Sequence, residues 1–158
     1  MTQSWPVADL DPIRRLRVMA ASIRGAGVAE RVVPATVDQV WAVASDLENE
    51  LPHLVRDFRS VRVSGRDGDR LTMHARGLLG QRARFDVVLE PGWCWCQSRF
   101  LLCGMAAAPH PDGTTFGFLG GVRLPVAGVL APLLSTAGRP LIAGVLDRLE
   151  QRVELRQL

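Results

Sequence analysis

The feature that most constrains the fold is a run of short strand-like segments that follow one another without a helix between them. Six such segments lie at residues 58–64, 70–76, 81–90, 93–102, 104–108 and 114–121. Turn-forming residues separate several of them, as in Gly-Arg-Asp-Gly at 65–68 and Pro-Gly at 91–92. Because consecutive strands joined by short turns pair antiparallel, the sequence predicts an antiparallel meander.

The strands alternate apolar and polar residues, which indicates that one face of the sheet is covered and the other meets water. Phe85 and Val87 alternate with charged neighbours, and Leu71 and Met73 do so in the segment before. A strand with this period packs one of its faces on a core. We therefore expect an α+β fold in which helices cover one face of a single sheet.

The helices that could cover this face lie on both sides of the meander. Before it, a strand at residues 28–34 is followed by a short helix that starts at a capping box of Thr36 and Gln39. A second short helix covers about residues 47–54. Neither helix is long enough to be stable alone, so both must pack on the rest of the chain.

After the meander, the chain is apolar and then helical. Residues 124–134 form an apolar segment interrupted by prolines and a glycine. Pro140 can occupy the first turn of a helix that runs to about Arg156. Its apolar stripe recurs at helical spacing and consists of Leu141, Val145, Leu149 and Val153.

The first 26 residues are predicted to form an amphipathic helical extension of a domain that spans residues 27–158. Asp11-Pro12 is a helix start, and apolar residues recur at helical spacing from Ile13. Such a basic helix can pack on its own domain or on a second subunit, as in a homodimer. Contact with an anionic membrane surface is the other alternative.

The composition excludes several classes of function. All 19 basic residues are arginine, and there is no tyrosine, so neither a lysine Schiff base nor a tyrosine proton donor is available. The arginines are dispersed along the chain, which argues against a nucleic-acid partner. We find no phosphate loop, no dinucleotide fingerprint and no set of metal ligands, so no cofactor is expected. Cys94, Cys96 and Cys103 are predicted to be buried thiols in a cytoplasmic protein.

Four short motifs of the sequence resemble those of a known superfamily. They are Val-Pro-Ala-Thr-Val-Asp-Gln-Val-Trp at 33–41, Asp-Leu-Glu at 46–48, Leu-Pro at 51–52 and Gly-Thr-Thr at 113–115. In order and spacing these motifs resemble the START/Bet v 1-like (SRPBCC) superfamily, which includes polyketide aromatase/cyclases. The resemblance implies a helix-grip fold, in which a curved antiparallel sheet of about six or seven strands wraps around a long C-terminal helix. It also implies a ligand cavity between the two.

Alternation and resemblance together select the residues that would line this cavity. Those expected on the inner face of the sheet are Phe58, Leu71, Met73, Phe85, Val87, Phe100, Met105 and Phe118. Leu141 and Val145 would face them from the helix. The alternative is that the same residues form an ordinary core with no cavity between them. For chemistry, His53 near the cavity mouth is the candidate for proton transfer, and Ser98 is the candidate inner-face hydroxyl.

Two functions follow from this reading. The first is a cofactor-independent, cyclase-like enzyme that holds a polyketide-type substrate in a reactive shape. The aromatase/cyclases that the chain resembles carry polar side chains where this chain has Val87 and Leu89, so little acid–base chemistry is expected. The alternative is a non-catalytic carrier or sensor of a lipid, isoprenoid or quinone, in which residues 124–134 form a lid or a membrane-touching flap.

Overall fold

The structure is a computed structural model that describes residues 9–123 and 127–158, with side chains described for residues 9–123 and 139–158. Within those residues the chain forms one seven-stranded antiparallel sheet in the order β1-β7-β6-β5-β4-β3-β2. The strands are β1 (Ala26–Val33), β2 (Phe58–Asp67), β3 (Arg70–Gly77), β4 (Arg82–Glu90), β5 (Trp93–Gln97), β6 (Leu101–His110) and β7 (Gly113–Val122). The predicted meander is confirmed: β2 to β7 pair in sequence order, and β1 pairs with β7 as the edge strand.

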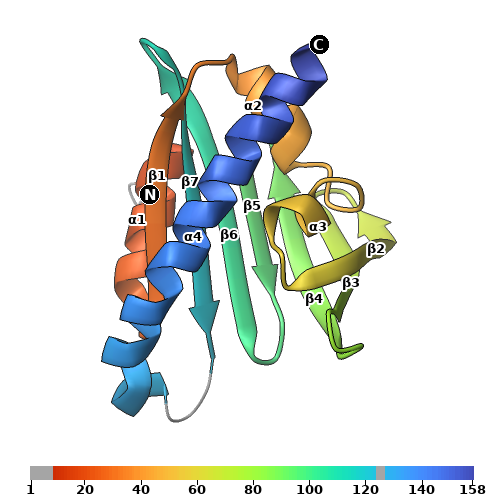
Figure 1. Cartoon of the computed structure of the whole chain (residues 1–158), viewed down its shortest axis with the longest axis vertical. Coiled ribbons are helices and arrows are strands. Elements are labelled where there is room, and N and C mark those ends of the chain that lie inside the picture. The colour runs from red at the N-terminus through yellow and green to blue at the C-terminus, as the bar shows by residue number, and fades with distance from the viewer. Residues whose placement is uncertain (1–8, 124–126) are drawn as a thin grey trace, which may run out of the picture.

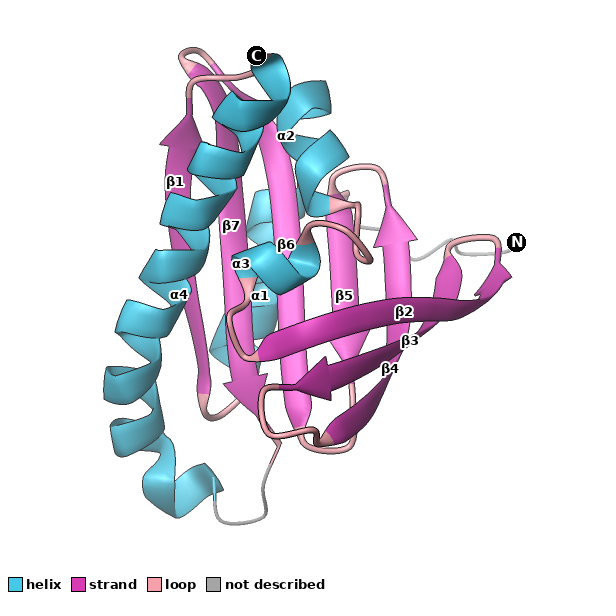
Figure 2. Cartoon of the chain, turned by 45° about the vertical axis from the view of Figure 1, so that its right-hand side comes forward, coloured by secondary structure: helices cyan, strands magenta, loops and turns pink. Residues whose placement is uncertain are grey.

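The helices lie on both faces of the curved sheet. The long α4 (Ala127–Gln157) crosses the concave face diagonally, with α2 (Val37–Ala44) and α3 (Leu51–Leu54) beside it (Figure 1). The N-terminal helix α1 (Pro12–Ser22) packs behind the sheet, against β1, β6 and β7. Figure 2 shows how β2, β3 and β4 curl away from the other strands, so that the sheet wraps around α3 and α4. The predicted sheet wrapped around a long C-terminal helix is confirmed.

The predicted starts of two helices are also confirmed. The Asp11 side chain accepts hydrogen bonds from the backbone N–H groups of Ile13 and Arg14, at 3.0 and 3.1 Å. Thr36 and Gln39 form the complete capping box: each side chain accepts a hydrogen bond from the backbone N–H of the other residue.

One turn of the meander was predicted in the wrong place. The sequence suggested a single strand over residues 93–102, but β5 ends at Gln97 and the chain reverses at Ser98-Arg99-Phe100. This turn contains neither glycine nor proline. The Ser98 hydroxyl stabilises the turn, because it accepts hydrogen bonds from the backbone N–H groups of Phe100 and Leu101 at 3.3 and 2.9 Å.

The C-terminal helix starts earlier than the sequence predicted. We expected it to begin at Pro140, but α4 begins at Ala127 and continues through both Pro132 and Pro140. Proline disfavours a helix interior, since it lacks an N–H and its ring crowds the preceding turn, and for that reason the sequence pattern indicated a break. Residues 124–126 of the predicted lid or flap lie outside the described residues.

Helix α1 covers the outer face of its own sheet. Ile13 and Leu16 are buried among Trp93, Ala106 and Leu119. Leu16 can approach the strands closely because they carry glycine there: a Cβ on Gly117 would lie 2.8 Å from Leu16 Cδ2. Of the alternatives left open by the sequence, the structure shows packing on the chain's own domain, and this packing covers the apolar face of the helix.

A buried carboxylate fixes the C-terminal end of α4 over α2 and α3. Glu50 is 2% exposed and accepts hydrogen bonds from Arg152 Nε at 2.6 Å and from Arg156 Nε at 3.0 Å. Arg156 also bonds Asp46 at 2.7 Å. The hydrogen bond from Arg152 lowers the pKa of Glu50, although burial alone would raise it. The carboxylate is therefore charged at neutral pH and holds one end of the helix in place.

Candidate ligand-binding site

A pocket of about 520 Å³ lies between the middle of α4 and the sheet. Its walls come from β1, the start of β2, β4, β6, β7, the segment that joins α3 to β2, and the face of α4 from Pro140 to Arg148. The aromatic part of its lining is Phe58, Phe85 and Phe118, and Ile142 and Val145 are aliphatic walls on the helix. A volume of this size suits a small organic molecule.

Small residues on neighbouring strands form part of the pocket wall. Gly27 of β1 is paired with Gly120 of β7, and Gly120 is paired with Cys103 of β6. All three line the pocket, and a Cβ built on either glycine would point toward Ile142. Because this row of the sheet carries no large side chain, Ile142 of α4 approaches it closely, to 2.8 Å from the position of a Cβ on Gly27.

Half of the ligand-binding residues predicted from the sequence lie together in this pocket. They are Phe58, Phe85 and Phe118 from the sheet and Leu141 and Val145 from α4. The rings of Phe58 and Phe85 meet edge to face with their centroids 5.8 Å apart. Leu141 is 63% exposed and so forms part of the rim, whereas Val145 is buried.

Four other predicted residues belong to the core and do not line this pocket. Leu71, Met73, Val87 and Met105 are all buried in the main hydrophobic cluster. They do lie on the inner face, as their alternation predicted. The pocket occupies only the part of the concave face that these side chains leave free.

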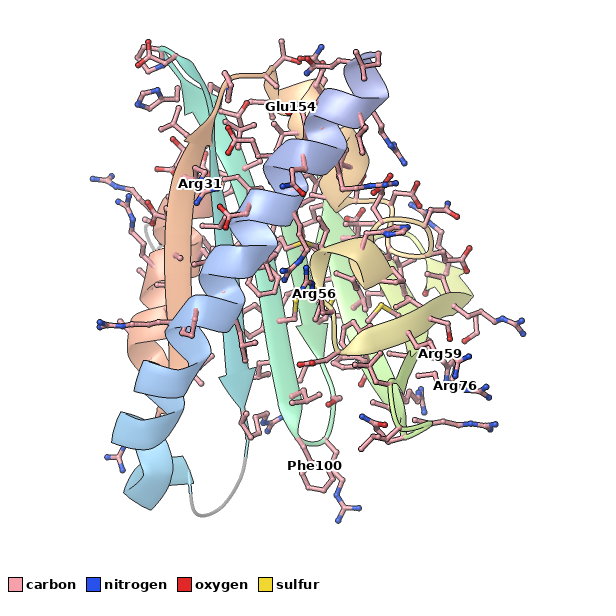
Figure 3. The ribbon with its side chains drawn as sticks, in the orientation of Figure 1. Arg31, Arg56, Arg59, Arg76, Phe100 and Glu154 are labelled. Carbon is pink, nitrogen blue, oxygen red and sulfur yellow. The ribbon has the colours of Figure 1, made fainter. Side chains whose placement is uncertain are left out.

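The prediction that Phe100 faces the interior is wrong. The residue lies in the turn between β5 and β6, and its side chain is 50% exposed and projects away from the sheet (Figure 3). The cause is the misplaced turn described above, since the alternation was continued through a chain reversal.

The two candidate catalytic side chains do not lie in the pocket. His53 is exposed on α3 and is absent from the pocket's described lining. The hydroxyl of Ser98 is occupied by the turn that it supports. Neither side chain has the contact with a bound molecule that proton transfer would require.

The cysteines form a buried thiol cluster at the pocket floor. Cys94 Sγ and Cys96 Sγ are 3.7 Å apart, Cys96 pairs with Cys103 across β5 and β6, and Cys103 lines the pocket. The contact with Cys96 and burial raise the pKa of the Cys103 thiol well above its usual range. A thiol that stays protonated is a poor nucleophile. Among the residues with described side chains, no group of His, Cys, Asp and Glu could hold a metal ion.

Three charged residues of the pocket were not identified from the sequence. Arg56 and Asp57 come from the segment between α3 and β2, and Arg148 comes from α4. Arg56 points into the space between α3 and α4 (Figure 3). Strand alternation says nothing about residues of a loop, and Arg148 lies outside the apolar stripe from which the helix residues of the site were selected.

A second hollow of similar size, about 510 Å³, lies along β2 to β5. It is lined by charged and polar groups that include Arg66, Asp67, Arg70 and Asp86. It does not include α4 in its described lining, and it offers a hydrophobic guest less apolar surface than the pocket beside α4.

Comparison with solved structures identifies this architecture. The chain superimposes on the protein TTHA0849 from Thermus thermophilus with a TM-score of 0.65 and 21% identity, over 84% of this chain and 99% of that protein. It superimposes on the Zhui aromatase/cyclase from Streptomyces sp. R1128 with a TM-score of 0.61 and 13% identity, over 84% and 95%. A START superfamily protein from Mycobacterium smegmatis matches with a TM-score of 0.56 and 21% identity, over 82% and 96%. The chain has the START-like helix-grip fold.

The helix-grip fold accounts for the position of the pocket between sheet and C-terminal helix. The expected likeness to START proteins and to polyketide aromatase/cyclases is confirmed at the level of the fold. No protein-family model matches the sequence. No curated protein matches it either. Among the described helices, none is both long and apolar enough to cross a membrane.

Proposed function

We propose that this protein binds a hydrophobic small molecule in the pocket between the sheet and α4. The observation that carries the proposal is the unfilled volume of about 520 Å³ above the row of Gly27, Gly120 and Cys103. An interior packed to the usual density has few voids larger than a water molecule. The pocket is partly open to solvent, and its volume indicates that the side chains of α4 and the sheet do not fill all of the space between them.

A neutral fluorescent probe tests this proposal. N-phenyl-1-naphthylamine should bind the protein saturably, with the rise in fluorescence that apolar surroundings cause. Leu141→Glu should weaken this binding at least about threefold, because it places a charge at the rim where the probe enters an apolar site. The matched control is Leu155→Glu: Leu155 is similarly exposed on the same helix, at 57%, but does not line the pocket.

Two outcomes would contradict the proposal. One is the lack of saturable binding by the wild-type chain. The other is an equal loss of affinity in the Leu141 and Leu155 variants, which would show that the probe adheres to exposed apolar surface rather than to the pocket.

A second candidate is a cyclase-like enzyme of polyketide-type natural-product biosynthesis. The observation that favours it is the likeness to Zhui, a protein named as an aromatase/cyclase, over 84% of this chain. Since His53 and Ser98 lie away from the pocket, such catalysis would depend on holding a flexible chain in a folded, reactive shape.

Product analysis separates the enzyme from the carrier or sensor. A linear poly-β-ketone thioester incubated with a cyclase should give a cyclised product, detected by mass spectrometry as the loss of water from an aldol condensation. A carrier should release the same compound unchanged. If the cyclase acts through shape, His53→Ala and Ser98→Ala should retain most of the rate, whereas a large loss in either variant would refute the shape-driven mechanism.

A further inference from the structure

Two arginine side chains line the rim of an otherwise apolar pocket. Arg56 reaches it from the segment between α3 and β2, and Arg148 reaches it from α4 (Figure 3 for Arg56). Asp57 is the one acidic side chain in the described lining, so the three charged groups leave a net positive charge beside the apolar walls. A neutral hydrocarbon ligand would make no favourable electrostatic interaction with this charge.

The guanidinium of Arg148 is held in a fixed place. Its Nε–H donates a hydrogen bond of 2.8 Å to the backbone carbonyl of Leu54. One helical turn earlier, Gly144 leaves room for the other end of the group: a Cβ at that position would lie 2.9 Å from Nη1 and 3.4 Å from Nη2. The side chain is thus anchored through Nε, and its planar face lies across a glycine.

Two arginines that follow Arg148 on α4 form ion pairs, whereas Arg148 has no such partner among the described side chains. Arg152 and Arg156 form ion pairs with Glu50 and Asp46. Asp147, the neighbour of Arg148, is taken by Arg31. Within the part of the chain whose side chains are described, no carboxylate lies within ion-pair distance of Arg148 or Arg56.

The electrostatics of the rim agree with this arrangement. Burial and the positive charge of Arg56 both lower the pKa of Arg148, and the opposing effects of Asp147 and Asp57 are smaller. Two cations that face one partly buried space destabilise each other. An anion bound between them relieves this repulsion and accepts charge-assisted hydrogen bonds from guanidinium groups.

We propose that the pocket is built for an amphipathic carboxylate, with the carboxylate at Arg148 and Arg56 and the apolar body against Phe58, Phe85, Phe118 and Val145. This inference rests on the proposed hydrophobic-ligand function and adds the charge and orientation of the ligand. The rim fixes the charged end, so the apolar end extends toward the glycine row on the sheet.

Two probes of equal chain length test the inference by titration calorimetry. Dodecanoate carries the carboxylate and dodecanol does not. The wild-type protein should bind dodecanoate at least about tenfold more tightly, since hydrogen bonds to a charged group contribute more than neutral ones. Arg148→Gln should reduce the affinity for dodecanoate by about tenfold and change that for dodecanol by less than about twofold.

Two further variants separate charge recognition from damage to the fold. Gly144→Ala keeps the charge of Arg148 but displaces its guanidinium, and because alanine favours a helix, Tm should not fall. It should weaken the binding of dodecanoate selectively. Arg62→Gln, on β2 and outside the pocket lining, is the matched arginine control and should change neither affinity.

The possible failures are distinguishable. Equal affinity for dodecanoate and dodecanol, or equal effects of Arg148→Gln on both, would overturn the carboxylate inference and leave the hydrophobic pocket standing. Failure of both probes to bind would overturn the proposed function together with the inference.

Discussion

Gly120 of β7 lies directly opposite Gly27 of β1, and Ile142 of α4 packs over both of them. A Cβ on Gly120 would make ordinary contacts, at 3.6 Å from Phe118 and 3.8 Å from Ile142. There is therefore room for a Cβ at Gly120, whereas a Cβ at Gly27 would lie only 2.8 Å from Ile142 Cδ1. Both glycines line the pocket of about 520 Å³, and that volume is the property that a ligand-binding site needs.

Filling this volume should abolish binding without harming the fold. Gly120→Ile places a branched side chain in the pocket at a strand position where such residues are favoured. We expect the affinity for N-phenyl-1-naphthylamine to fall by at least about tenfold, because the isoleucine occupies the space of the probe. The Cβ makes ordinary contacts with Phe118 and Ile142, so the variant should remain folded, and thermal denaturation checks this.

The control for this variant is Gly65→Ile on β2. Gly65 also has room for a Cβ, with its nearest neighbour 3.7 Å away, and it does not line the pocket. The Gly65→Ile variant should bind the probe with unchanged affinity. Full binding by Gly120→Ile would show that the probe binds elsewhere.

The polar side chains first suspected of catalysis should prove structural or neutral. Ser98→Ala removes the hydroxyl that accepts two backbone N–H groups of the β5–β6 turn, so it should lower the free energy of unfolding by about 1 kcal/mol. Its affinity for the probe should not change, because Ser98 does not line the pocket. Thermal denaturation and fluorescence titration measure the two effects, and a selective loss of binding with unchanged stability would contradict this assignment.

The close approach of α1 to the sheet should appear as coupling between two residues. Gly117→Ala places a Cβ 2.8 Å from Leu16 Cδ2 and should destabilise the protein by about 1–3 kcal/mol. Leu16→Ala alone should cost about 2–5 kcal/mol, since Leu16 is fully buried. Because the shorter side chain makes room for the new methyl group, the double variant should be less destabilised than the sum. Strict additivity in denaturant unfolding would contradict the described packing.

Acid should weaken the attachment of α4 through Glu50. A carboxylate whose pKa is lowered on folding stabilises the fold above its unfolded pKa, which is about 4.3 for glutamate. This stabilisation is lost as the pH falls from there through the lower value of the folded state. Glu50→Gln should cost about 2 kcal/mol at neutral pH and flatten this part of the stability profile.

Glu90→Gln is the matched control for this charge. Glu90 pairs with Arg15 at 3.3 Å, but both side chains are well exposed, so the change should cost less than about 1 kcal/mol. Equal effects of the two substitutions in urea titrations would show that the buried ion pairs of Glu50 do not stabilise the fold.

The fold was largely predictable from the sequence because its main signals are local. Alternation in β3 and β4 placed Met73 and Phe85 on the inner face, and the capping box located the start of α2. The turn at Ser98 was missed because a serine hydroxyl supports it in place of glycine or proline. The early start of α4 was missed because Pro132 and Pro140 are tolerated inside a long helix.

The site was less predictable, since it depends on which strands pair with each other and on which residues of the sheet face α4. Alternation selected inner-face residues but could not tell that Phe118 lines the pocket and Met105 does not. The pairing of Gly27 with Gly120 arises only when strands distant in the sequence meet. Arg148 becomes a pocket residue because the carbonyl of Leu54 anchors it.

An NMR titration of the full ¹⁵N-labelled chain with N-phenyl-1-naphthylamine tests the central claim most directly. We predict saturable shifts concentrated at the amides of Gly27, Phe58, Gly120 and Val145, which come from four separate elements around the pocket. Saturable shifts centred instead on α1 and the outer face of the sheet, or no saturable shift at all, would contradict a ligand site between the sheet and α4.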